Sequence, residues 1–137
     1  MIIADYYLHN GNIAFLEKEW DYIKSLVCQI DALVEKDGSM RLSRYFLDWP
    51  TADTEGRAGT YALCAYAMRK AKIIYRALKE DCTVLDGILH RIECTLKGGA
   101  FKQVTAMRVL AGFDKAEDVV GCLIGNGARG MSTFMSY

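Results

Sequence analysis

The chain has 137 residues, and its 17 basic and 17 acidic side chains cancel to a formal net charge of zero. The sequence shows neither a basic stripe nor a polybasic segment, and no run of about 20 apolar residues, which argues against a nucleic-acid or membrane partner. The length predicts one domain, and a single proline among many helix-forming residues predicts an all-α fold. Zero net charge with 52% apolar residues also favours self-association, so we expect a homo-oligomer.

The N-terminal third is predicted to be helical. Residues 2–9 are typical of a helix, and Asn12 is a plausible N-cap for a long second helix. This second helix is expected to end at Asp37-Gly38. Its apolar seam has three-four spacing and consists of Ile13, Leu16, Trp20, Ile23, Val27, Ile30 and Val34. A second line predicts packing on several neighbours and consists of Phe15, Tyr22, Leu26 and Leu33.

Residues 38–58 are predicted to form a long loop, which in a compact domain is usually functional or disordered. The aromatic cluster in Tyr-Phe-Leu-Asp-Trp-Pro, residues 45–50, argues against disorder. Pro50, the only proline, favours an extended conformation at Trp49.

Further helices are predicted downstream. The first half of a helix from about Gly59 to Lys79 is uncharged on every face, which predicts burial all round, whereas its basic second half predicts an exposed end. Residues 85–96 and 101–110 predict two more helices, closed by Gly98-Gly99 and by Gly112. Asp114 and Glu117 resemble a capping box that opens a short helix, and another helix is expected near Ser132. The expected fold is all-α, built of consecutive antiparallel helical hairpins.

Several kinds of site find little support in the sequence, which indicates no metal and no cofactor. His9 and His90 stand far apart without zinc-type partners. The segment Gly125–Gly130 lacks the preceding strand and the Lys-Ser/Thr ending of a phosphate loop. An odd number of widely spaced cysteines predicts free, mostly buried thiols and slightly favours a cytoplasmic location: Cys28, Cys64, Cys82, Cys94 and Cys122.

The aromatic loop is the strongest candidate for a site. A carboxylate at Asp48 can accept hydrogen bonds from sugar hydroxyls, and Trp49 offers a flat apolar face to a pyranose ring. Asp53 and Glu55 lie in the same predicted loop, and glycosidases use two carboxylates that flank a sugar. The competing interpretation is a solvated acidic loop with Trp49 packed as a lid on the core.

The order of four segments resembles the catalytic domain of α-L-rhamnosidase-like glycoside hydrolases. The segments are DYYLHNGNIAFLEKEWDYIKSLVCQID, DGSMRLSRYFLDWP, EGRAGTYALCAYAMRKAKIIYRAL and GARGMSTFMSY, and they cover nearly the whole chain. The resemblance implies an (α/α)6 barrel, the six-hairpin glycosidase fold, in which Asp48 and Trp49 line the sugar pocket. Asp53 and Glu55 match no family position firmly, although we keep all four as candidate substrate-binding residues.

The resemblance also implies that the family's catalytic carboxylates fall outside this chain. Twelve helices of ~12 residues with ~5-residue links need at least ~200 residues, so these residues supply about half a barrel. We therefore expect a fragment that holds part of a sugar-binding wall, no catalytic residue of its own and no hydrolysis of rhamnosides alone. The helix faces that the missing half of the barrel would cover are expected to be exposed, and such exposed faces favour a dimer. Two alternatives stay open: a stand-alone helical interaction module, and a six-hairpin glycosidase specific for another sugar.

Overall fold

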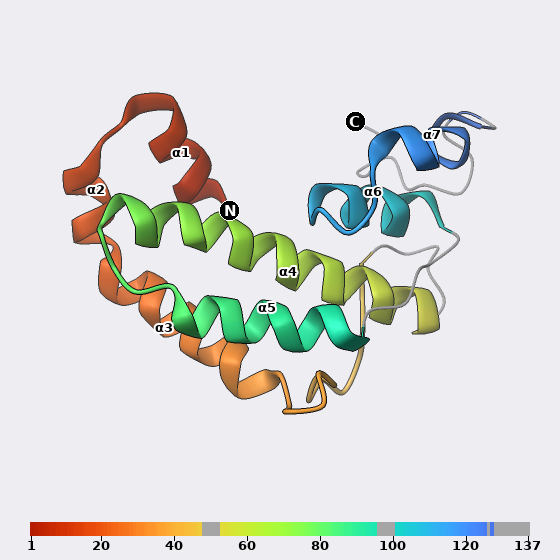
Figure 1. Ribbon diagram of the computed structural model, residues 1–137, viewed down its shortest axis with the longest axis horizontal. Helices are drawn as coiled ribbons and strands as arrows, with labels where there is room; N and C mark the ends of the chain where they lie inside the picture. Colours follow the sequence, from red (N-terminus) through yellow and green to blue (C-terminus); the bar gives the residue numbers. More distant parts are fainter. Residues whose placement is uncertain (48–52, 96–100, 126, 128–137) are drawn as a thin grey trace. The chain divides into compact units, whose positions relative to one another are not determined.

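The computed structural model describes residues 1–47, 53–95, 101–125 and 127. In these ranges the regular structure is helical, and this confirms the predicted all-α class (Figure 1). One isolated antiparallel bridge joins Val34 and Met40. The helices are α1 (Ile2–Asn10), α2 (Ile13–Lys18), α3 (Trp20–Leu33), α4 (Asp53–Ala77), α5 (Thr83–Thr95), α6 (Lys102–Leu110) and α7 (Ala116–Ile124).

The chain divides into two compact units, and α4 contributes to both. The first unit contains Met1–Arg41 and Ala67–Thr95, and the second contains Leu42–Tyr66 and Leu96–Tyr137. None of the described helices combines the length and apolar character that a bilayer-spanning segment needs.

In the first unit, α5 runs antiparallel to the second half of α4 (Figure 1). Arg69 of α4 pairs with Glu93 of α5 at 2.7 Å, and Lys72, one turn further along α4, pairs with Asp86, near the start of α5. The core of this unit comes from helices α1 to α5 and the segment after α3. Its largest buried side chains are Leu16, Ile23, Val27, Val34, Met40, Met68, Ile74, Tyr75, Leu85, Ile88, Leu89 and Ile92. The helix predicted over residues 85–96 is confirmed as α5, whose Leu85, Ile88, Leu89 and Ile92 are all buried.

The predicted long helix after Asn12 is interrupted. Asn12 does act as N-cap, because its side-chain oxygen accepts a hydrogen bond from the Phe15 amide at 3.0 Å. Glu19, at φ −90° and ψ 3°, separates α2 from α3, although the amides of Glu19 and Ile23 still bond to carbonyls four residues earlier. Apolar spacing cannot reveal a one-residue change of this kind, because the seam continues on both sides of it.

The second apolar line along this segment is covered only in part, since Phe15 and Leu33 are half-buried. Tyr22 is 56% exposed and Leu26 is 39% exposed, whereas Ile23 and Val27 of the main seam are buried. The described residues of the first unit therefore leave the middle of this second line, at Tyr22 and Leu26, exposed. Helix α3 ends at Leu33, before the predicted Asp37-Gly38, and Gly38 (φ 81°) instead lies in a turn where the Glu35 amide bonds to the Ser39 carbonyl.

The second unit contains an antiparallel hairpin of α6 and α7. Thr105 Oγ1 lies 3.8 Å from Cys122 Sγ, and the Lys102 ammonium bonds to the carbonyl oxygens of Gly125 and Gly127 at the far end of α7. Gly112, at φ 74°, follows α6 directly and confirms the predicted helix end. The first half of α4 adds Tyr61, Ala62 and Ala65 to the buried residues of this unit.

The predicted capping box at Asp114 is wrong. Helix α7 has Lys115 as its N-cap and shows no side-chain capping bond. Asp114 forms a bidentate pair with Arg108 of α6, at 2.6 Å and 2.7 Å. A charge-assisted pair of this geometry is stronger than a capping bond, so the carboxylate turns back to α6.

The predicted loop over residues 38–58 is also too long. Helix α4 begins at Asp53, so Asp53 and Glu55 are helical rather than loop residues. Carboxylates are favoured in the first turn of a helix, where the backbone amides carry partial positive charge. The acidic residues that suggested a loop are thus consistent with a helix start.

Candidate functional site

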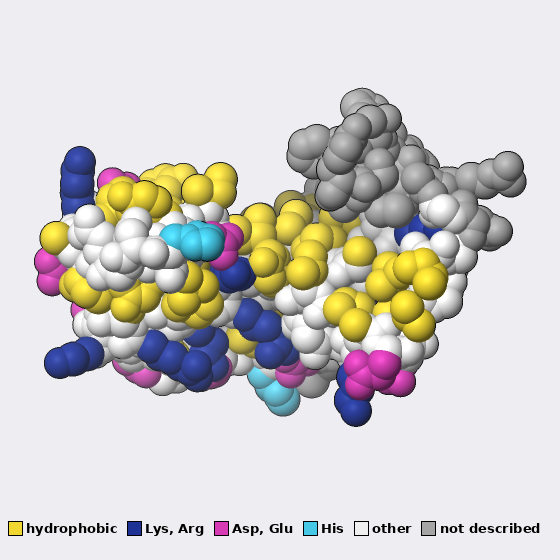
Figure 2. Space-filling view, turned by 90° about the horizontal axis from the view of Figure 1, so that it is seen from above, with side chains coloured by type: hydrophobic (Ala, Val, Ile, Leu, Met, Phe, Trp, Pro, Cys, Tyr) yellow, Lys and Arg dark blue, Asp and Glu magenta, His cyan; other side chains and the backbone are white. Residues whose placement is uncertain are grey.

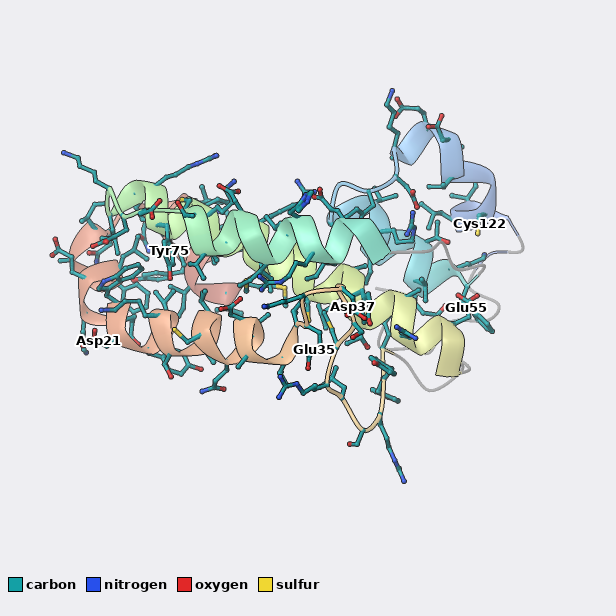
Figure 3. The ribbon with its side chains drawn as sticks, turned by 60° about the horizontal axis from the view of Figure 1, so that its bottom comes forward. Asp21, Glu35, Asp37, Glu55, Tyr75 and Cys122 are labelled. Carbon is teal, nitrogen blue, oxygen red and sulfur yellow. The ribbon has the colours of Figure 1, made fainter. Side chains whose placement is uncertain are left out.

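The candidate site adjoins the N-terminal half of α4 in the second unit. Asp48, Trp49 and Pro50 lie outside the described residues. The backbone is described on both sides of them, up to Leu47 and again from Asp53, although the side chain of Asp53 is not described. Glu55 is partly buried in the first turns of α4 (Figure 3), and its Oε2 atom is inaccessible to solvent.

Tyr45 is held against α4 by an aromatic and cationic cluster. Its ring centroid lies 6.0 Å from that of Tyr61, with the ring planes inclined at 64°. The Arg57 guanidinium carbon lies 5.7 Å from the Tyr45 centroid and 5.4 Å from that of Tyr61. Arg57 Nε also donates a hydrogen bond to the Tyr61 hydroxyl at 3.2 Å. Edge contacts of aromatic rings and cation–π contacts each contribute about 1 kcal/mol, so the cluster gives Tyr45 a preferred position.

Leu47 is held against α4 by close packing on a glycine. A Cβ atom built on Gly59 would lie 2.4 Å from Leu47 Cδ2 and 2.9 Å from Leu47 Cβ. No real Cβ approaches so closely, so only glycine permits this contact. Thr60, the next residue, donates its hydroxyl to the Gly56 carbonyl at 2.8 Å, and this leaves only a weak contact with the Phe46 carbonyl at 3.5 Å.

These five residues, Tyr45, Leu47, Arg57, Gly59 and Tyr61, form what we call the anchor. They fix the chain on α4 immediately before Asp48, and α4 itself fixes the chain again at Asp53. The anchor and the start of α4 therefore set the two ends of the segment that carries Asp48 and Trp49.

The anchor also perturbs one ionisable group. Desolvation raises the pKa of the Tyr45 hydroxyl, and the neighbouring Tyr61 hydroxyl raises it further, whereas the positive charge of Arg57 opposes the increase. Tyr45 is therefore a neutral hydroxyl at physiological pH and can donate or accept a hydrogen bond, but it is not an anionic base.

The helical start of α4 changes the expected pairing of carboxylates. Positions 53 and 55 are two residues apart on a helix, and positions with that spacing do not face each other. Glu55 is partly buried within the second unit.

Gly125 and Gly127, the described residues of the glycine-rich segment after α7, do not have the arrangement of a phosphate loop. Lys102 directs its ammonium to the carbonyl oxygens of Gly125 and Gly127, so these two residues present acceptors rather than amide donors. Phosphate loops bind their anions through backbone amides. The interpretation of a helix-connecting loop is therefore preferred for the part of the segment that the structure describes.

Cysteines and histidines form no metal site in the described residues. No group of three His, Cys, Asp or Glu side chains there has the geometry of a cation site. Cys28, Cys64, Cys82 and Cys122 are free thiols, as predicted, but the prediction of burial is wrong for them: two are exposed and two are partly buried. Burial does raise the pKa of the Cys64 thiol, which lowers its reactivity at neutral pH.

Sequence reasoning missed three members of the anchor. Arg57 and Tyr61 are one helical turn apart, a spacing that brings side chains together, and Gly59 lies between them in an otherwise strong helix. A glycine at an interior helical position is a usable signal of close packing.

No family model matches the chain, and neither the curated proteins nor the solved structures contain a match.

Proposed function

We propose that these residues form part of the sugar-binding wall of an α-L-rhamnosidase-like glycoside hydrolase, with Asp48 and Trp49 as the sugar-contacting residues. The observation that carries the proposal is the anchor, which fixes the chain on α4 one residue before Asp48. A sugar site needs such fixed ends because a preorganised segment loses less conformational entropy on binding. The all-α architecture is compatible with half of an (α/α)6 barrel, whose remaining hairpins would come from residues outside this chain.

In this proposal the residues have separate roles. Trp49 packs its ring against the apolar face of the pyranose, and Asp48 accepts hydrogen bonds from ring hydroxyls. The anchor touches no sugar and only positions them. The acid and base of an inverting mechanism lie outside these residues, so the chain alone does not hydrolyse an aryl α-L-rhamnoside.

The proposal is tested by tryptophan fluorescence. The chain has two tryptophans, and Trp20 lies in the first unit with its ring 4.6 Å from that of Tyr75. In a Trp20→Phe variant the signal comes from Trp49 alone, and titration with L-rhamnose should change it saturably. A Trp49→Phe variant, which keeps Trp20, is the matched control and should show no response.

Substitution of Asp48 sharpens the test. Hydrogen bonds to a charged group contribute about 1.5–3 kcal/mol, so Asp48→Asn should weaken rhamnose binding by roughly 10- to 100-fold. Equal responses to D-glucose and L-fucose would favour a six-hairpin glycosidase for another sugar. No response to any monosaccharide, or turnover of the aryl rhamnoside by the purified chain, would contradict the proposal.

A helical interaction module is the second candidate, because the first unit exposes several large apolar side chains on α1 and α3. The same titration distinguishes the two candidates, since an interaction module has no reason to respond to L-rhamnose.

A further inference from the structure

We draw no further inference here: the strongest candidate, the patch of exposed hydrophobic side chains on α1 of the first unit (Figure 2), is interrupted by Asp5 and His9, and nothing in the described part of the structure shows what covers it.

Discussion

The tightest contact of the anchor gives a sharp prediction for Gly59→Ala. In an unobstructed helix this change stabilises by up to about 1 kcal/mol, because glycine is a poor helix former. Here the new methyl group would lie 2.4 Å and 2.9 Å from two atoms of Leu47, one of which is Leu47 Cβ and cannot turn away. Overpacking of this kind costs about 1–3 kcal/mol, so the net change should be a destabilisation of about 1 kcal/mol.

Two other helical glycines are built-in controls for this substitution. A Cβ on Gly121 of α7 would meet no atom within 4 Å, and one on Gly87 of α5 would meet only Arg91 Nη1 at 3.9 Å. Both alanine variants should therefore be stabilised by about 0.5–1 kcal/mol. Urea unfolding followed by circular dichroism measures all three, and Gly59→Ala should be the only one of them whose midpoint falls.

A second substitution locates the clash. In the Gly59→Ala background, Leu47→Ala removes the atom at 2.4 Å, so the two changes together should cost less than the sum of their separate effects. The reasoning is refuted if Gly59→Ala stabilises the chain as much as Gly121→Ala does. It is also refuted if the Leu47 and Gly59 substitutions are additive.

Two further predictions concern a helix cap and an ion pair. Asn12→Ala should lower the free energy of unfolding by about 1 kcal/mol, because alanine cannot accept the hydrogen bond from the Phe15 amide. Asn12→Ser should keep most of the stability, because a serine hydroxyl can accept it as asparagine does, and thermal unfolding of both variants checks this. The Arg108 guanidinium, through its hydrogen bonds, lowers the pKa of the Asp114 carboxyl. As the pH falls below about 4, the unfolded chain therefore takes up this proton before the folded chain does. The stabilisation that the Arg108–Asp114 pair contributes is complete at neutral pH and is lost in acid. Unfolding free energies measured from neutral to acid pH should decline less steeply for Asp114→Asn than for the unchanged chain, and equal slopes would contradict the assignment.

The helices themselves were the most predictable part of the structure. Local signals located α5 through its apolar stripe, α6 through the Gly112 stop and the start of α2 through Asn12. Local signals failed where a side chain could form either a local capping bond or a contact with another helix. Asp114 matches a capping box, but its partner is Arg108 on the preceding helix, and only the fold brings the two together.

The candidate site was predicted less completely, for a related reason. The motif drew attention to the aromatic segment, but the contact of Tyr45 with Tyr61 joins residues on two different elements. Acidic residues suit both a loop and the first turn of a helix, so the sequence placed Asp53 and Glu55 in the loop although both belong to α4. Compositional patterns identify residues suited to a chemistry, whereas the geometry decides which of them can act together.

The anchor limits the entropy that any ligand of Asp48 and Trp49 must overcome. Without it, the chain would have no fixed point in the second unit between Leu42, where that unit begins, and Asp53, where α4 begins. Fixing Leu47 shortens the stretch between the two ends from ten intervening residues to five, and the closure cost scales as (3/2)RT ln n, which gives about 0.6 kcal/mol. That corresponds to roughly a threefold gain in affinity for a ligand that requires one conformation of the segment. The anchor can therefore tune binding only modestly. In the proposed sugar site, specificity would therefore come from Asp48, Trp49 and the groups that complete the pocket around them.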